Sequence, residues 1–395
     1  MNSYDYYLKK LQYLEQKNLI RDLKKIDKKE NQNIFIENKK LLNLSSNDYL
    51  GIGTNNEILR EFYNYLLQNN LLFNIDFTSS SSRLLTGNSN IYTELENKIA
   101  NLYQKQKAII FNSGYHLNSG LLPALTEKND VIFSDKLNHA SIIDGIKLSD
   151  AEHFRYNHLN YNHLETLLQK YREQYNNAII VSESLFSMDG DIADLKKLVE
   201  LKNKYNCLLY IDEAHAIGVF GEKGLGLAEE LNIISDIDIL IATFGKAFAS
   251  IGAFCVVNDI LYRYILNTAR SLIFTTALPS VNLYWTNFIL DEIINLTSER
   301  QYLKRISSEI RSFIENSTQS KSISQSQIIP IIIGDNEKTL KLARLFQENE
   351  ILLLAIRPPT VPQGTSRLRL SLTANLNNDD IQKIKTVIQK VLKSE

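Results

Sequence analysis

The stretch Cys207-Leu-Leu-Tyr-Ile-Asp-Glu-Ala-His215 decides the fold class. Its first five residues form an almost entirely apolar run, as in a strand buried on both faces, and the run ends at Asp212. Similar runs alternate with helical patterns between about residues 90 and 280. They are Lys107–Phe111, Val131–Ser134, Ala178–Val181, Ile239–Ala242 and Ala253–Val257. This alternation predicts an α/β fold whose parallel or mostly parallel sheet is covered by helices.

Polar residues follow directly after five of these runs, and parallel sheets place their sites beyond the carboxyl ends of the strands. A lysine beside apolar strands can act as a nucleophile or base and can form a Schiff base. An aspartate can hold a protonated ring nitrogen, and a glycine turn that opens a helix can hold a phosphate. Together these groups predict a pyridoxal phosphate site. They are Asp212 and His215, Thr243 and Lys246, Ser182 and Glu183, Asp135 and His139, and Asn112 to Tyr115.

The two ends of the chain differ from this central region. Leu8, Leu11 and Leu14 recur at helical spacing and predict an amphipathic arm, followed by an extended segment at Asn33–Glu37. A long helix is expected from Val281 to Glu315. Beyond it we expect strands Ile328–Ile333, Ile351–Ala355 and Arg367–Leu372, with helices Asn336–Asn349 and Asp379–Leu392. The predicted division is a helical arm over 1–45, a large cofactor-binding domain over 46–280 and a small α+β domain over 281–395.

Composition excludes several classes of protein. The chain has 395 residues with 44 Lys and Arg against 45 Asp and Glu, so it offers no broad basic field for nucleic acid. Its two cysteines, Cys207 and Cys255, form neither a disulfide framework nor a metal motif. The N-terminus has no apolar leader, and no apolar run approaches the ~20 residues of a membrane helix. We therefore expect a cytoplasmic protein without a metal, with no nucleic-acid or membrane partner.

Two short motifs point elsewhere but lack their context. Asp212-Glu-Ala-His215 spells a helicase box, yet the chain has no G-x-x-x-x-G-K-[ST] phosphate loop. Gly224-Leu-Gly226 is not followed by the third glycine of a dinucleotide-binding turn.

As a set, the motifs resemble the α-oxoamine synthases, which are pyridoxal phosphate enzymes of the aspartate aminotransferase fold (fold type I). The likeness runs from about residue 17 to 390. It implies a mostly parallel large domain, a small α+β C-terminal domain, and a homodimer with active sites at the subunit interface. The segments that carry it are Asn43–Gly51, Ser82-Arg83, Gly87–Ser89, Phe111–Tyr115, Asp135–Ser141, Glu183–Asp191, Asp212–His215, Thr243–Lys246 and Ser271–Pro279.

The resemblance assigns four catalytic residues. Lys246 matches the Schiff-base lysine, Asp212 the partner of the pyridine nitrogen and His215 the partner of the phenolic oxygen. His139 matches the residue stacked over the cofactor ring. The other cofactor contacts that it implies are Gly114 and Tyr115 at the phosphate turn, Thr243, Ser187 near the ring oxygen, and Thr276 (or Thr275) reaching the phosphate from the neighbouring subunit.

The C-terminal segments Ala355–Pro362 and Gly364–Ser371 resemble the branch of the family that forms 8-amino-7-oxononanoate in biotin biosynthesis. This likeness implies decarboxylative condensation of L-alanine with a pimeloyl thioester, carried by coenzyme A or by a carrier protein. The alternative is a relative that uses glycine or serine with a different acyl-CoA. A catalytically silent subunit of the same fold is disfavoured because Lys246 is present.

Four residues are candidate substrate contacts, and the first is His139, which the resemblance also places over the cofactor ring. Arg369 matches the arginine that holds the amino-acid carboxylate, although strand alternation puts Arg367 on the same face. Thr360 matches a further substrate contact. In the N-terminal arm Arg21 is the candidate, with Lys24 as the alternative alignment.

The chain departs from the family pattern at three places. Ser79, Ser80 and Ser81 replace a glycine-rich stretch, Tyr92 stands where many relatives have histidine, and Ala249 replaces a common glycine.

Overall fold

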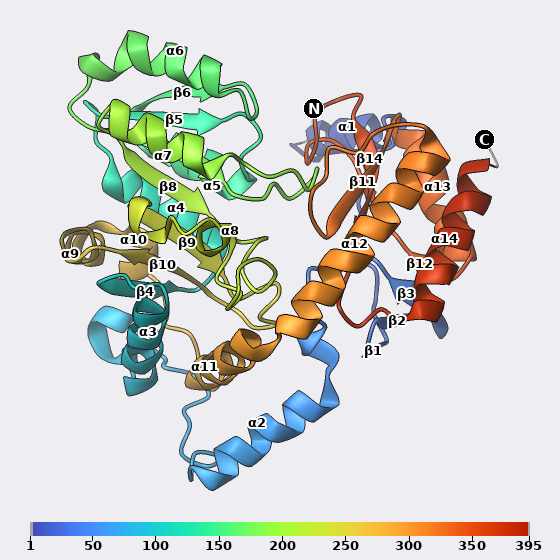
Figure 1. Ribbon diagram of the computed structural model, residues 1–395, viewed down its shortest axis with the longest axis horizontal. Coiled ribbons are helices and arrows are strands. Elements are labelled where there is room, and N and C mark those ends of the chain that lie inside the picture. The colour runs from blue at the N-terminus through green and yellow to red at the C-terminus, as the bar shows by residue number, and fades with distance from the viewer. Residues whose placement is uncertain (1–2, 394–395) are drawn as a thin grey trace. The chain divides into compact units, whose positions relative to one another are not determined.

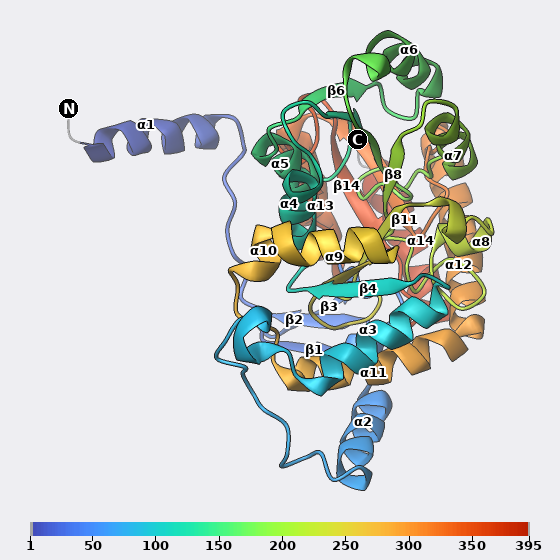
Figure 2. The same cartoon turned by 90° about the vertical axis from the view of Figure 1, so that its left-hand side faces the viewer.

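The computed structural model describes residues 3–393, which fold as two compact units (Figures 1 and 2). The first unit comprises the chain up to Thr54, the short segment Met188–Asp191 and the chain from Gln301 onward. The second unit comprises Asn55–Ser187 and Ile192–Arg300. The three-part division at residues 45 and 280 stays a prediction.

A seven-stranded sheet forms the centre of the second unit, in the order β4-β10-β9-β8-β7-β5-β6. Neighbouring strands are parallel except β10, which runs antiparallel to both β4 and β9. The predicted α/β fold with a mostly parallel sheet is therefore confirmed. The strands are β4 Lys107–Phe111, β5 Val131–Asp135, β6 Glu152–Tyr156, β7 Ala178–Glu183, β8 Leu208–Asp212, β9 Ile239–Thr243 and β10 Ala253–Val257.

Burial explains which of these strands could be predicted. Strands β5, β7, β9 and β10 are buried at every position, as the apolar runs indicate. Strand β6 lies at the edge of the sheet and exposes Glu152, His153 and Arg155. It has no apolar run and was missed, because only a strand inside the sheet must be apolar on both faces.

Helices cover this sheet, and Figure 2 shows α4 and α5 on one side of the strands and α7 on the other. Asparagine, serine, aspartate or histidine caps the start of several of them by accepting a backbone N–H. The helices of this unit are α2 Asn56–Gln68, α3 Asn90–Leu102, α4 Gly114–Leu125, α5 Ala140–Leu148, α6 Tyr161–Tyr171, α7 Leu195–Lys204, α8 Leu227–Glu230, α9 Asp259–Thr268, α10 Arg270–Ile273 and α11 Ser280–Asn295.

The first unit holds two small sheets, in the orders β1-β2-β3-β12 and β11-β14-β13. Its strands are β1 Lys28–Glu30, β2 Asn33–Ile36, β3 Lys39–Asn43, β11 Ile328–Gly334, β12 Ile351–Leu352, β13 Ala355–Ile356 and β14 Ser366–Ser371. The remaining helices of the chain are α1 Ser3–Gln16, α12 Thr297–Thr318, α13 Asn336–Glu348 and α14 Asn378–Lys393. No helix among residues 3–393 is long and apolar enough to span a membrane.

Two element predictions were wrong. The expected strand Ile351–Ala355 is two short strands, because the chain leaves one sheet after β12 and joins the other at β13. The expected helix from Val281 to Glu315 breaks at Leu296 into α11 and α12. The Arg300 guanidinium donates to the carbonyls of Ile293 and Ile294 (2.6 and 3.2 Å), which satisfies the last turn of α11 and stabilises the break.

Candidate active site

A cavity of about 170 Å³ lies in the second unit, where the parallel strands end. It brings together six residues predicted from the sequence: Gly114, Tyr115, His139, Asp212, Thr243 and Lys246. Six residues to which the sequence analysis gave no role complete its lining: Asn118, Ser141, Glu183, Ala214, Ile241 and Ala242. Ser187 and His215 are buried in the same unit but are not among the lining residues.

The start of helix α4 suits a phosphate. Ser113 caps the helix, and its Oγ accepts the backbone N–H of His116 at 3.2 Å. A Cβ added at Gly114 would lie 3.7 Å from the Cβ of Thr243, which is ordinary contact. The protein therefore has room for a Cβ at position 114, and packing alone does not explain the glycine. The space that the glycine leaves lies at a helix N-terminus, where backbone N–H groups bind anions.

The turn after strand β9 presents Lys246. The Thr243 hydroxyl accepts the N–H of Gly245 at 3.1 Å and donates to the carbonyl of Gly252 at 3.0 Å. Within this turn Ala249 has φ 47, a left-handed conformation that favours glycine. Ser80, in the other stretch where glycine is replaced, has φ 46. Both departures from the family pattern thus keep a glycine-like backbone at a cost of about 1 kcal/mol each.

Asp212 ends strand β8 with its carboxylate buried. Its Oδ1 accepts the backbone N–H of Ala214 at 2.9 Å, and its Oδ2 accepts the amide of Asn118 at 3.0 Å. A buried carboxylate held by donors at the cavity wall fits the protonated ring nitrogen of pyridoxal phosphate, since charge-assisted hydrogen bonds are strong.

His139 caps helix α5 with its own ring. Its Nδ1 accepts the backbone N–H of Ser141 at 3.2 Å and lies 2.7 Å from the Ser141 hydroxyl. Desolvation lowers the pKa of His139, and the positive charge of Lys246 adds to this effect, against the attraction of Asp212 and Asp144. The result is a neutral ring at the cavity, suited to lie against a flat cofactor.

Glu183 is a buried acid that the sequence analysis placed among the polar residues after the strands but gave no role. It pairs with Asp212 across strands β7 and β8. Burial raises the pKa of Glu183 well above its usual value, and the neighbouring charge of Asp212 raises it further. Its Oε1 has no hydrogen-bond partner among the residues that the structure describes. Burial thus favours the protonated form of Glu183.

The other unassigned residues carried weak sequence signals. Asn118 lies one helical turn after Gly114, on the same face of α4. Ser141 follows His139 by two residues. The packing of α4 against α5 brings Asn118 and Ser141 together, and local patterns do not show such packing.

In the first unit the structure separates the roles of two arginines on β14. Arg367 forms an ion pair with Asp189, and both side chains are buried. Arg369 donates to the Ser371 hydroxyl at 2.7 Å and to Asn47 Oδ1 at 3.2 Å. Its second terminal nitrogen lies 3.4 Å from the Tyr49 hydroxyl. Arg367 is thus committed to a carboxylate of its own chain, which supports Arg369 as the residue for a substrate carboxylate.

The N-terminal arm of this unit places Arg21 and Lys24 differently. Arg21 donates to the carbonyls of Arg357 and Pro358 at 3.3 and 3.0 Å. Thr360 belongs to the same turn, because its N–H donates to the Arg357 carbonyl at 3.1 Å. Lys24 instead donates to Gln347 Oε1, on helix α13. The structure therefore brings Arg21 and Thr360 to one turn and leaves Lys24 elsewhere.

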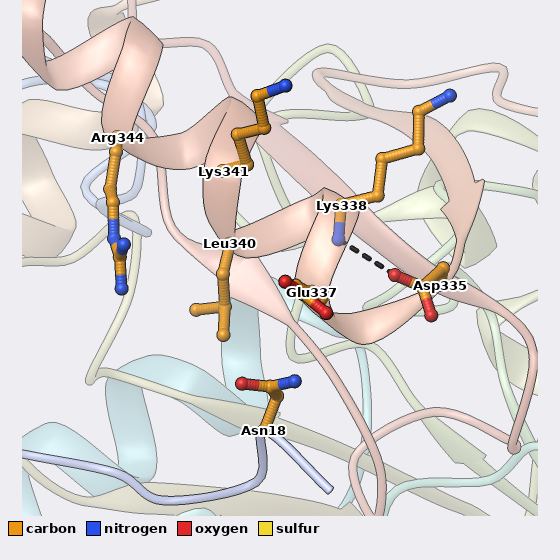
Figure 3. Close-up of a pocket in the computed structure, with 7 residues that line it drawn as sticks. All are labelled: Asn18, Asp335, Glu337, Lys338, Leu340, Lys341 and Arg344. Atoms are coloured by element: carbon orange, nitrogen blue, oxygen red, sulfur yellow. Dashed lines mark hydrogen bonds between the residues drawn. The ribbon is translucent and has the colours of Figure 1, made fainter.

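A second cavity, of about 670 Å³, lies beside helix α13 and contains none of the predicted site residues (Figure 3). Figure 3 shows the side chains of Lys338 and Lys341 extending away from Asn18, whereas Arg344 extends to the other side. These cations do not converge on one point. The residues that line this second cavity are Asn18, Asp335, Glu337, Lys338, Leu340, Lys341 and Arg344.

Residues 39–388 match the family profile described as aminotransferase class I and II. The chain belongs to this family. A relative from Haemophilus influenzae, provisionally named 8-amino-7-oxononanoate synthase, is 53% identical over 350 residues, which cover 88% of this chain and 91% of that protein. A relative of the same name from Neisseria meningitidis is 51% identical over 347 residues, which cover 88% of this chain and 90% of that protein.

Solved structures agree with the family. Serine palmitoyltransferase from Sphingomonas wittichii superposes with a TM-score of 0.90 at 26% identity and covers 100% of this chain and 98% of that chain. 8-Amino-7-oxononanoate synthase from Francisella tularensis superposes with a TM-score of 0.73 at 28% identity. The superposition covers 90% of this chain and 98% of that chain. The resemblance to the α-oxoamine synthases and the fold type I architecture are confirmed. The protein is a pyridoxal phosphate enzyme of this fold.

Proposed function

We propose that the protein condenses L-alanine with a pimeloyl thioester, either pimeloyl-CoA or a pimeloyl carrier protein, and releases carbon dioxide to give 8-amino-7-oxononanoate. The names of the relatives at 51 to 53% identity support this acyl transfer as a step of biotin biosynthesis. The observation that carries the proposal is the cavity that joins Lys246, Asp212 and His139 at one sheet edge.

Each of these side chains has a role that its surroundings support. When bound, pyridoxal phosphate supplies an electron sink for the carbanion formed at Cα of the amino acid. The Lys246 amine would hold the cofactor and then, once released, remove the Cα proton at Nζ. The Asp212 carboxylate would hold a proton on the ring nitrogen, and the neutral His139 ring would lie against the flat cofactor. We propose that His215 holds the phenolic oxygen and that Ser187 contacts it.

Binding of the amino acid falls to Arg369 in this proposal. A guanidinium can pair both oxygens of the alanine carboxylate in a fixed plane. The ion pair of Arg367 with Asp189 supports this choice, because Arg367 already neutralises a buried carboxylate. Arg21 and Thr360 are proposed to contact the acyl substrate, and their shared turn supports them as a pair.

A rival activity follows from the solved structures. The superposition on a serine palmitoyltransferase favours a serine- or glycine-using synthase of the same fold. The identity to that protein is 26%, against 53% for the relative named for the alanine-dependent reaction. We therefore place alanine first.

We further propose a homodimer. In the second unit Phe73, Phe77, Leu85 and Phe274 are 91, 79, 79 and 70% exposed. The Ala277 N–H donates to the Ser81 carbonyl at 2.9 Å, so the segments that carry Leu85 and Phe274 run side by side. Such a set of exposed apolar side chains fits an interface with a second copy. Thr276, which is exposed next to this surface, is proposed to reach the partner's phosphate site.

The substrates can be tested by measuring carbon dioxide release with alanine, glycine and serine, each offered with pimeloyl-CoA and with a pimeloyl carrier protein. We expect turnover with alanine to exceed turnover with the other two amino acids. Faster turnover with serine or glycine would replace this proposal by its rival. Comparison of the two thioesters identifies the acyl carrier.

A further inference from the structure

Three buried side chains connect the residues proposed to hold the cofactor ring. Asn118 on α4, Ser141 on α5 and Tyr210 on β8 are each at most 2% exposed. The Tyr210 hydroxyl lies 2.6 Å from Asn118 Oδ1, and Asn118 Nδ2 lies 3.0 Å from both the Ser141 hydroxyl and Asp212 Oδ2. Ser141 in turn lies 2.7 Å from His139 Nδ1. The chain of hydrogen bonds thus ends at Asp212 on one side and at His139 on the other.

The chemistry of these groups gives each hydrogen bond a direction. The oxygen of an amide only accepts, so the Tyr210 hydroxyl must donate to Asn118 Oδ1. The amide then points both of its N–H groups at its other two partners, Ser141 and Asp212. The opposite amide orientation would set Oδ1 against the Asp212 carboxylate, where no proton lies between them. In the observed orientation Asn118 Nδ2 donates to Asp212 Oδ2, so the amide supports the Asp212 carboxylate as an acceptor.

The same logic fixes the proton on His139. The Ser141 oxygen accepts from Asn118, so its own proton is available to His139 Nδ1. The backbone N–H of Ser141 also points at Nδ1, at 3.2 Å. Two donors on one ring nitrogen leave no room for a proton there, and the ring must be neutral with its proton on Nε2.

A glycine makes this connection possible. A Cβ added at Gly145 on α5 would lie 2.3 Å from the backbone oxygen of Asn118 on α4. Any larger residue would separate the two helices and would move Asn118 away from Ser141. The hydrogen bond between Asn118 and Ser141 therefore depends on the close packing of α4 against α5.

We propose that Asn118 is a positioning residue that, through Ser141, fixes His139 as the neutral Nε2-protonated tautomer and that holds the Asp212 carboxylate in place by donating to its Oδ2. A cationic His139 would compete with the cofactor ring nitrogen for the charge of Asp212. The other charged groups that act on His139 are Lys246 and Asp144, whose effects oppose each other. The inference depends on the cofactor site and not on the choice of amino acid or thioester.

Nitrogen-15 NMR of histidine tests this in the full-length protein, with pyridoxal phosphate bound and after its removal. The chain has six histidines, and His139→Gln assigns the signals of that ring. We expect its Nδ1 unprotonated and its Nε2 protonated at pH 7 in the wild-type protein. A proton on Nδ1 of His139 in the wild-type protein at pH 7 would by itself overturn the proposal.

Variants test the connection itself. Ser141→Ala removes one donor to the neutral ring, so we expect the pKa of His139 to rise by about 0.5 to 1 unit. Asn118→Asp keeps the acceptor for Tyr210 but loses the donors, and it should raise that pKa as well. Ser119→Ala, on the same helix and outside the connection, should leave it unchanged. Intact signals from the other five histidines show that a variant is folded. An unaltered His139 pKa in both folded variants, Ser141→Ala and Asn118→Asp, would overturn the proposal. This result would not depend on which amino acid the enzyme uses as its substrate.

Discussion

At the residue scale, Arg367 and Arg369 show how two neighbouring arginines on one strand divide their work. Arg367 has an ionic partner inside its own unit, whereas Arg369 donates to the neutral side chains of Asn47, Ser371 and Tyr49. Strand alternation alone could not separate them, because both point to the same face. The separation depends on Asp189, which is distant in sequence.

This difference predicts that one alanine substitution affects substrate binding and the other affects stability. Arg369→Ala should raise the Michaelis constant for alanine about 10- to 150-fold, because a charge-assisted hydrogen bond contributes about 1.5–3 kcal/mol. Arg367→Ala should lower the free energy of unfolding by about 3–5 kcal/mol, since it leaves Asp189 buried without its cation. Steady-state kinetics and urea unfolding of both variants separate the roles. A raised Michaelis constant for alanine in folded Arg367→Ala, with none in Arg369→Ala, would reverse the assignment.

Asp212 allows a second prediction at this scale. Asp212→Asn keeps the size of the side chain but removes the charge that we propose holds the ring proton. We expect kcat to fall at least about 10- to 100-fold, with little change in the thermal midpoint of the protein without cofactor. Kinetics and thermal melts provide both values. Near-normal turnover with alanine would reject this role for Asp212.

At the element scale, the short helix α8 depends on one buried acid. Glu213 accepts the backbone N–H groups of Leu227 and Ala228, at 3.2 and 2.7 Å, at the start of α8. Burial raises the pKa of Glu213 to about 7. In the unfolded chain the same group titrates near its ordinary value of about 4.3. The folded protein therefore binds the Glu213 proton more tightly, and its stability falls as pH rises from about 4.3 to 7.

Glu213→Gln should remove this dependence. Between pH 5 and 8 the free energy of unfolding of the wild-type protein should fall by up to about 3 kcal/mol relative to that of the variant. Urea unfolding followed by the fluorescence of Trp285, the single tryptophan, measures this difference in the second unit. Glu229→Gln, on the neighbouring half-buried acid, serves as the control. A parallel pH dependence in the wild-type and Glu213→Gln proteins would contradict the assignment.

The elements also show what the sequence could predict and why the rest escaped it. Strands β4 and β10 were predicted at both ends, since buried strands are marked by composition alone. The order of the strands was not predicted, and β10 separates β4 from the other four strands that end in site residues. Lys246, Asp212 and His139 followed from their position after strands. Asn118 and Ser141 did not, because the packing of two helices at Gly145 brings them together.

At the scale of the whole molecule, the apolar surface around Leu85 and Phe274 predicts a dimer. Leu85→Asp should shift the protein to monomers in analytical ultracentrifugation and should lower turnover, because the proposed contact of the partner's Thr276 with the phosphate would be lost. Ile260→Asp is a matched control, since Ile260 is 78% exposed against 79% for Leu85 and lies on α9. A fully active wild-type monomer would contradict the proposed interface.

The central claim is that Lys246 holds pyridoxal phosphate in the cavity at the carboxyl ends of the parallel strands. Borohydride reduction followed by peptide mapping tests this claim most directly. Reduction fixes the cofactor on the lysine that holds it, so that mass spectrometry can identify that residue. We predict one modified peptide, with the cofactor on Lys246, and none in Lys246→Ala. Modification of a different lysine, or an unmodified Lys246 in the active protein, would contradict the account.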